Sequence, residues 1–72
     1  MSNLNYREIG QRIRGLRREH RLKQAQLAAV IYVSINHMGH IESGDKPVQL
    51  DMLVTLAEYF GVSLDYLVLG KR

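Results

Sequence analysis

Residues 24–44 of the chain read QAQLAAVIYVSINHMGHIESG, and this stretch decides the fold. Its opening block, residues 24–29, consists of good helix formers and predicts a short helix. Ser34 is a preferred N-cap residue with apolar neighbours, so a further helix is expected from Ile35. Gly44 accepts the left-handed conformation of a helix end and is expected to stop that helix. The stretch therefore predicts two short helices joined by a tight turn.

The continuation of the first of these helices is a run whose structure periodicity alone leaves open. Residues 30–33, VIYV, are β-branched and aromatic, which is also typical of a buried strand. We reject the strand because the sequence offers no partner strand. A compact helix-turn-helix needs Ala where its helices meet, an apolar residue after the turn and two more apolar residues in the second helix. The residues at those offsets are Ala28, Val33, Met38 and Ile41.

The N-terminal part of the chain predicts a longer amphipathic helix. Residues 5–8, Asn-Tyr-Arg-Glu, have the pattern of a capping box, so this helix is expected to begin after Asn5. Apolar and basic residues then recur at helical spacing on opposite sides. The apolar side carries Ile9, Ile13 and Leu16, and the basic side carries Arg7, Arg14, Arg18 and Arg21. We therefore expect one buried face and one exposed basic face.

Two more helices are predicted in the C-terminal third. Between Pro47 and Gly61 a broad apolar face indicates a central helix, and we expect this face to be core. Its members are Leu50, Leu53, Val54, Leu56, Ala57 and Phe60. Ser63 repeats the N-cap pattern, and Gly70 is expected to end the last helix. The predicted fold class is all-α, a compact five-helix bundle.

Length and composition narrow the class of protein. The 72 residues suffice for a single domain spanning residues 1–72, with an ordered core expected at about 5–70. There is no Cys, so disulfides and thiolate metal sites are excluded. The polar N-terminus, residues 1–5, indicates no export signal, and the longest apolar run, residues 27–33, is far too short to span a bilayer. These features predict a cytoplasmic protein.

Charge is unevenly distributed along the chain. Residues 7–23 hold seven of the ten Lys and Arg against two Glu, a balance of +5. Residues 24–70 hold one Lys against five acidic residues, a balance of −4. Such asymmetry favours a polyanionic partner, although a solvated helix face explains a basic stripe equally well.

No pattern in the sequence favours catalysis or metal binding. The acidic residues are scattered, and no nucleophile is paired with a base, so we expect no enzyme activity. His37 and His40 stand three residues apart, but without Cys or further ligands they are better interpreted as surface histidines. The basic first helix needs its apolar side for the core, which argues against membrane binding. We therefore predict no cofactor, no metal and no small-molecule ligand.

From Ile9 to Gly70 the chain resembles the Cro and cI-like (XRE) helix-turn-helix family of transcription regulators. Four segments carry the resemblance through their order and spacing. They are residues 9–18 (IGQRIRGLRR), 22–28 (LKQAQLA), 41–44 (IESG) and 56–67 (LAEYFGVSLDYL). The resemblance implies that the helix after Ser34 enters the major groove of double-stranded DNA and contacts base edges there. The implied base-contacting residues are Ser34, Ile35, Asn36, His37 and His40.

These residue types suit that role. Asn pairs bidentately with adenine, an aliphatic side chain contacts a thymine methyl, and imidazole donates to guanine or phosphate. Asn36 is therefore the best single candidate for a base contact. Gln24 matches a phosphate contact of the family at the start of the helix before the turn. Further candidates for phosphate contacts are Arg21, Lys23, Ser43 and Lys46.

The resemblance also implies a structural ion pair between Arg17 and Glu42, which would orient the recognition helix. Removing one partner is expected to destabilise more than removing both. The chain departs from the family in having Lys23 at a position usually held by Ser or Thr and Tyr32 at a position usually held by Gly. A positive φ at Tyr32 would cost about 1 kcal/mol. Gly39 lowers helix propensity by about 1 kcal/mol and removes one potential base contact.

The last helix suggests how two copies meet. Leu64, Tyr66 and Val68 cannot all face one small core, and in the family this region often forms a dimer. We therefore expect a homodimer, at least on DNA, with recognition helices about 34 Å apart on a near-palindromic operator. The expected function is sequence-specific transcription regulation, most plainly repression; activation or service as an antitoxin would use the same surface. The alternative is a protein-interaction module that keeps the fold without reading DNA, motivated by Ile35, Gly39 and the weak basicity of the recognition helix.

Overall fold

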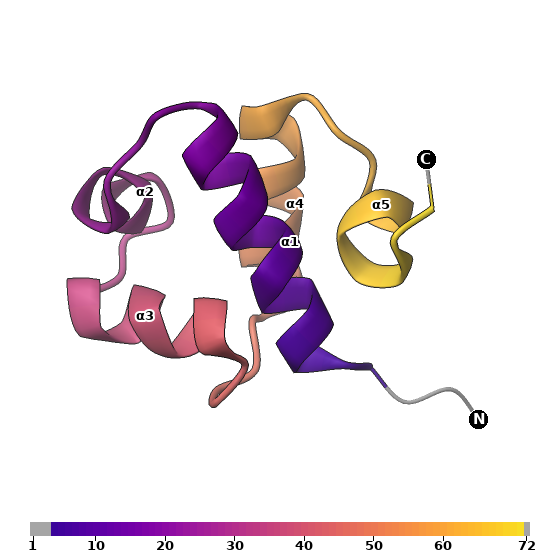
Figure 1. Ribbon diagram of the computed structural model, residues 1–72, viewed down its shortest axis with the longest axis horizontal. Coiled ribbons are helices and arrows are strands. Elements are labelled where there is room, and N and C mark those ends of the chain that lie inside the picture. The colour runs from indigo at the N-terminus through magenta and orange to yellow at the C-terminus, as the bar shows by residue number, and fades with distance from the viewer. Residues whose placement is uncertain (1–3, 72) are drawn as a thin grey trace.

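Five helices and no strand occur among residues 4–71, the part of the chain that the computed structural model describes. They are α1 (Tyr6–Glu19), α2 (Gln24–Val30), α3 (Ile35–Ser43), α4 (Leu50–Phe60) and α5 (Leu64–Leu69). Helices α2 and α3 lie together on one side of α1, and α5 lies on the other side (Figure 1). The all-α, five-helix prediction is confirmed. Residues 1–3 of the polar N-terminus, used above to predict localisation, lie outside the described residues.

The predicted caps start and end the helices. The Oδ1 of Asn5 accepts from the backbone N–H of Glu8 at 3.1 Å, and Ser34 and Ser63 cap α3 and α5 in the same way. The C-caps Gly44, Gly61 and Gly70 all have positive φ, as a left-handed helix end requires. The side chain of Glu8 accepts a hydrogen bond from Arg12. Of the two hydrogen bonds expected in the capping box, the structure therefore shows the one that Asn5 accepts.

Helix α2 begins without the Ser or Thr usual in the family. The backbone N–H of its N-cap Lys23 donates to the side-chain oxygen of Gln26 at 2.8 Å. This bond satisfies the amide of Lys23 itself. The amide of Gln26, which a Ser or Thr side chain at the N-cap would serve, donates instead to the backbone carbonyl oxygen of Lys23 at 3.0 Å. The helix ends at Val30, and Ile31 packs into the core at 5% exposed. Of the β-branched run only Val30 lies in α2, and residues 31–33 form the turn before α3; no strand occurs there, as the rejection of a strand predicted.

All five helices contribute side chains to one hydrophobic core. Its members in the helices are Ile9, Ile13, Leu16, Leu27, Ala28, Met38, Ile41, Leu53, Leu56, Ala57, Phe60 and Leu67. The prediction that the whole apolar face of α4 is core is wrong for two residues. Leu50 is 69% and Val54 37% exposed. Both lie at one edge of the apolar face, where the neighbouring helices leave them open to solvent.

Two contacts of α1 fix the elements on either side of it. Gly10 of α1 lies so close to the backbone of Ile41 and Glu42 that a Cβ there would overlap their carbonyl groups. The guanidinium of Arg12 donates to the carbonyl oxygens of Leu67 and Val68 at 3.0 and 3.1 Å. Because these carbonyls end α5 and lack helical partners, Arg12 ties α5 to α1.

Candidate nucleic-acid interface

Helix α3 has one buried and one exposed face. Met38, Ile41 and Glu42 are at most 1% exposed. Of the five residues predicted to contact bases, four are exposed and His37 is half-buried; the exposed four are Ser34, Ile35, Asn36 and His40. The helix lies at the edge of the molecule, well away from α5 (Figure 1). This places the predicted base-contacting side chains where a duplex has access to them.

The turn before α3 is closed by backbone hydrogen bonds. The N–H of Val33 donates to the carbonyl oxygen of Ala28 at 3.0 Å, and Ala28 is 2% exposed against the core. Tyr32 has a φ of +59°, so the expected condition for backbone strain is met. Its side chain is 94% exposed, so packing compensates little of that strain.

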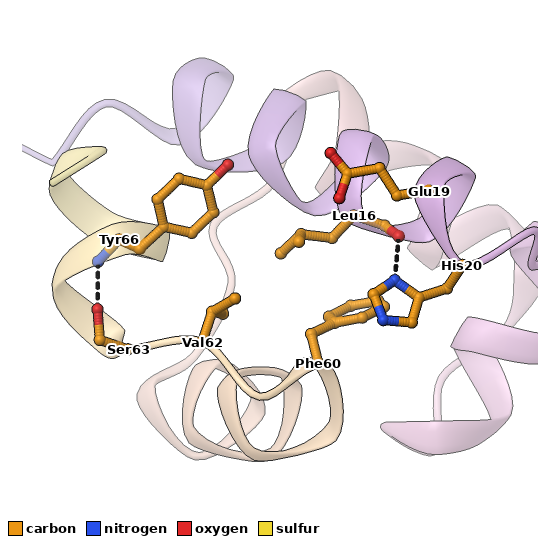
Figure 2. Close-up of a pocket in the computed structure, with 7 residues that line it drawn as sticks. All are labelled: Leu16, Glu19, His20, Phe60, Val62, Ser63 and Tyr66. Carbon is orange, nitrogen blue, oxygen red and sulfur yellow. Dashed lines mark hydrogen bonds between the residues drawn. The ribbon is translucent and has the colours of Figure 1, made fainter. Parts of the chain in front are cut away.

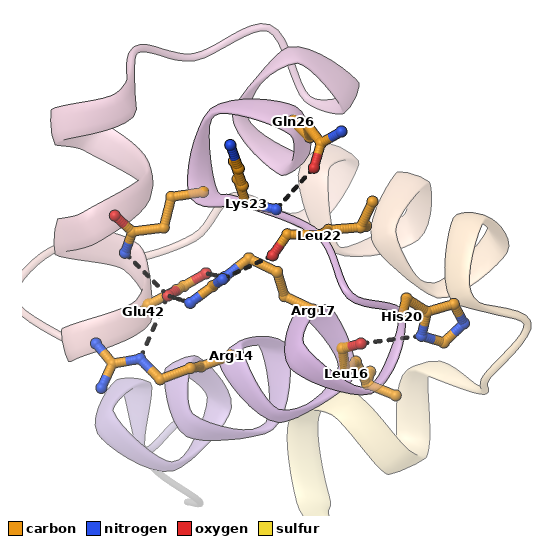
Figure 3. A network of polar contacts seen from close by, with 9 residues as sticks. Arg14, Leu16, Arg17, His20, Leu22, Lys23, Gln26 and Glu42 are labelled. Carbon is orange, nitrogen blue, oxygen red and sulfur yellow. Dashed lines mark hydrogen bonds and ion pairs between the residues drawn. The ribbon is translucent and has the colours of Figure 1, made fainter.

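The carboxylate of Glu42 fixes the orientation of α3 (Figure 3). Its Oε2 lies 2.7 Å from the Nε of Arg17, and its Oε1 lies 3.2 Å from the Nη2 of the same residue. Arg17 also donates to the carbonyl oxygen of Leu22 at 2.8 Å. The expected pair is thus present, and it joins α1, α3 and the segment before α2.

Two further side chains that donate to Glu42 were not predicted from the sequence. The Nε of Arg14 lies 3.3 Å and the Nε2 of Gln24 lies 3.1 Å from Oε1 of Glu42. Arg14 therefore turns toward α3 instead of standing free on an outer basic face. Burial alone raises the pKa of Glu42, but the hydrogen bonds from Arg17, Gln24 and Arg14 and the charge of Arg17 outweigh it, so the net pKa is lowered. The buried carboxylate is therefore ionised at neutral pH.

The predicted phosphate contacts lie on both sides of α3 in the sequence and are mostly exposed. Arg21 and Lys23 precede α2, whereas Ser43 ends α3 and Lys46 follows it; all four are exposed. Gln24 is half-buried and already donates one hydrogen of its amide to Glu42, which leaves the second for another acceptor. Arg21 has a φ of +56°, a feature that the sequence analysis missed.

The end of α3 places an acidic side chain beside a predicted base-contacting residue. The Oδ2 of Asp45 lies 3.3 Å from the Nδ1 of His40, and both side chains are exposed. The hydroxyl of Ser43 lies 3.1 Å from the carbonyl oxygen of His40. Hydrogen bonds from the side chains of Ser43 and His40 lower the pKa of Asp45. No pattern in the sequence marks Asp45 as a residue of this interface.

The predicted dimer residues differ in exposure. Leu64 is 36% exposed, whereas Tyr66 and Val68 are partly buried and pack against the core. Leu69, which was not predicted, is 53% exposed beside them in α5. The exposed apolar side chains of α5 are therefore Leu64 and Leu69.

A cavity of about 360 Å³ opens between the ends of α1 and α4 and the start of α5 (Figure 2). Its lining residues are Leu16, Glu19, His20, Phe60, Val62, Ser63 and Tyr66. The ring of His20 packs edge-on against Phe60, with 4.9 Å between ring centroids, and its Nδ1 lies 2.9 Å from the carbonyl oxygen of Leu16. The ring of His20 thus links the end of α1 to the end of α4.

Within residues 4–71, no three His, Asp or Glu side chains gather in a way that suits a metal ion. None of the helices described in that range has the length and apolar character needed to cross a membrane.

Comparison with known proteins places the chain in a family. Residues 13–67 match the helix-turn-helix family, so the chain belongs to it, and the resemblance to Cro and cI-like (XRE) regulators is confirmed. The chain is 41% identical over 58 residues to YobD of Bacillus subtilis, an uncharacterised helix-turn-helix transcriptional regulator. That match covers 81% of this chain and 52% of YobD, so the chain spans about half the length of this relative.

Two solved structures share the fold closely. The P22 c2 repressor, solved in complex with a synthetic operator, is 28% identical with a TM-score of 0.80 over 88% of this chain and 96% of its own. The restriction-modification controller protein C.AhdI from Aeromonas hydrophila is 29% identical with a TM-score of 0.76, over 86% and 94% of the two chains. The phage-repressor-like architecture expected from the sequence is therefore confirmed.

Proposed function

We propose that this domain is a sequence-specific DNA-binding repressor that inserts α3 into the major groove. The observation that carries the proposal is the two-sided character of α3, whose Asn36 and His40 are exposed while Glu42 anchors the opposite side. An α-helix fits the major groove, where each base pair presents a distinct pattern of donors and acceptors. The P22 c2 repressor, which shares this fold, was solved in complex with a synthetic operator, and this supports operator binding by this chain.

Affinity and selectivity come from different residues in this proposal. Arg21, Lys23, Gln24, Ser43 and Lys46 contact backbone phosphates, which fixes the register of the domain but carries no sequence information. Asn36, with Ser34, Ile35, His37 and His40, discriminates bases. The simplest consequence is that the bound protein blocks polymerase at the operator. Because the DNA of a bacterium lies in the cytoplasm, the proposal also locates the protein there.

A homodimer is part of the proposal. Leu64 and Leu69 of α5 expose apolar side chains that a second copy could cover. A twofold dimer carries two recognition helices, which matches a near-palindromic operator with half-sites about one helical turn apart. Sedimentation with and without operator DNA tests this part; a monomer under both conditions contradicts it.

The salt dependence of binding tests the function itself. Fluorescence anisotropy with labelled duplex DNA should give a steep fall in affinity as salt rises, with a slope near −0.9 per phosphate neutralised. Lys46→Ala should reduce that slope by about 1 per domain, whereas Asn36→Ala should leave it unchanged. Absence of duplex binding at low salt would reject the proposal.

A second candidate function has a specific observation in its favour. Tyr32 is 94% and Ile35 55% exposed at the turn and the start of α3, so this end of the interface offers apolar surface to a protein. A protein-interaction module or an antitoxin component would bind its partner with little salt dependence, because apolar contacts release no counterions. The same titration therefore distinguishes the two candidates.

A further inference from the structure

The ending of α3 sets the carboxylate of Asp45 beside His40. The backbone N–H of Asp45 donates to the carbonyl oxygen of His40 at 3.0 Å, and the chain reverses at Gly44, which has a φ of +85°. These features fix the position of the Asp45 backbone independently of its side chain. From that position Oδ2 lies 3.3 Å from the Nδ1 of His40.

The negative charge of the Asp45 carboxylate is unfavourable for two reasons. It adds negative charge at the C-terminus of a helix, where the helix dipole favours cations. It also stands between Ser43 and Lys46, two predicted phosphate contacts, where a carboxylate repels the DNA backbone. Because Ser43 and His40 lower the pKa of Asp45, the group is ionised at neutral pH and both costs apply. Its favourable interactions are those with the side chains of Ser43 and His40 and with the charge of Arg7, and the contact with His40 is the one that reaches a predicted base-contacting residue.

That contact determines which nitrogen of His40 carries the proton. An ionised carboxylate only accepts hydrogen bonds, so the hydrogen lies on Nδ1 whenever the contact is made. The Nε2 of the neutral ring is then a hydrogen-bond acceptor. In the major groove its complementary partners are exocyclic amino groups, N6 of adenine and N4 of cytosine.

We propose that Asp45 is a positioning residue for base selection: it holds Nδ1–H of His40, so that Nε2 accepts from the amino group of adenine or cytosine. The inference rests on the proposed DNA-binding function. Without Asp45 the ring is free to rotate and to change tautomer. The preference at the base pair facing His40 is then lost, while the phosphate contacts remain.

A double-mutant cycle measures this effect. The operator comes from selection on a random duplex pool, and the position that faces His40 is the one whose preference His40→Ala removes. Affinities for the four base pairs at that position are then measured at pH 8 for the wild type, Asp45→Ala, His40→Ala and the double variant. On the strand that faces His40, the wild type should prefer adenine or cytosine over guanine or thymine by about fivefold or more. Asp45→Ala should reduce this preference to less than twofold and should change nothing further in the His40→Ala background.

Two controls separate positioning from charge. Asp45→Asn removes the charge and offers Nδ1 both an acceptor and a donor, so it no longer fixes the tautomer and should give a preference between those of the wild type and Asp45→Ala. Glu58→Gln removes an exposed acidic charge on α4 and should leave the preference unchanged. The inference is overturned if Asp45→Ala keeps the wild-type preference, if it alters all four duplexes equally in both backgrounds, or if guanine is preferred at pH 8. Failure of the wild type to bind any duplex would reject the DNA-binding function itself.

Discussion

The guanidinium of Arg17 contacts both carboxylate oxygens of Glu42, with Nε at 2.7 Å from Oε2 and Nη2 at 3.2 Å from Oε1. The side chain of Glu42 is fully buried, and that of Arg17 is 12% exposed. The pair links α1 to the inner face of α3, so the angle at which α3 leaves the body of the domain depends on it.

The two partners are not equivalent, because Arg14 and Gln24 also donate to Glu42. Glu42→Ala leaves Arg17 without its anion and should lower the free energy of unfolding by about 3 kcal/mol or more. Arg17→Ala should cost clearly less, because two donors to the carboxylate remain. Urea unfolding followed by circular dichroism measures both. The double variant Arg17→Ala/Glu42→Ala should cost less than the sum of the single variants, and a cost equal to that sum would contradict this account.

Acid should remove the contribution of Glu42. The folded state lowers the pKa of Glu42 below its ordinary value of 4.5, because hydrogen bonds from Arg17, Gln24 and Arg14 outweigh the effect of burial. A lowered pKa contributes stability that is present above the unfolded value and is lost as the pH falls through the folded value. Between pH 7 and pH 3 the wild type should therefore lose more stability than Glu42→Gln. Parallel curves for the two proteins would show that the carboxylate contributes nothing.

Substitution of Gly10 and of Gly15 in α1 by Ala should have opposite effects on stability. Gly10→Ala places a Cβ against the carbonyl groups of Ile41 and Glu42, whereas nothing lies within 4 Å of the corresponding position at Gly15. Gly10→Ala should destabilise by about 1 to 3 kcal/mol through overpacking. Gly15→Ala should stabilise by up to about 1 kcal/mol through helix propensity. Thermal unfolding of the two variants checks this, and equal shifts of Tm would refute the close contact of α1 with α3.

Arg21 combines backbone strain with a predicted phosphate contact. Its φ of +56° suits glycine, so Arg21→Gly should raise stability by about 1 kcal/mol while weakening DNA binding at every sequence. Tyr32→Gly is the matched control, because Tyr32 has a φ of +59° and is not a predicted phosphate contact. It should give a similar gain in stability and keep the salt slope of the wild type. If Arg21→Gly also keeps that slope, Arg21 does not contact phosphate.

Features that depend on a few neighbouring residues were predictable from the sequence. The Ser34 cap and the end of α3 at Gly44 follow from local backbone chemistry, and the structure has both. The Arg17 and Glu42 pair followed from the family resemblance alone, since 25 positions separate the two residues. The same limitation hid Arg14 and Gln24, whose convergence on Glu42 depends on how α1, α2 and α3 pack.

Features at the edges of elements were predicted less well. Apolar residues at helical spacing show which face of a helix is apolar, but they do not show how much of that face the other helices cover. Leu50 and Val54 were therefore assigned to the core in error. Arg12 was missed for a related reason, because its acceptors are carbonyl groups at the end of α5 and no side-chain pattern marks them. Asp45 was missed because its position beside His40 depends on the reversal at Gly44.

The most direct test of the account is the change in base preference caused by a single substitution in α3. Wild-type protein and Asn36→Ala are each used to select bound duplexes from a random pool. The wild type should enrich a near-palindrome with half-sites about 10 base pairs apart, and the variant should lose the preference at one position in each half-site while keeping the others. Identical motifs for the two proteins, or no enrichment with either, would contradict the assignment of α3 as the element that reads DNA.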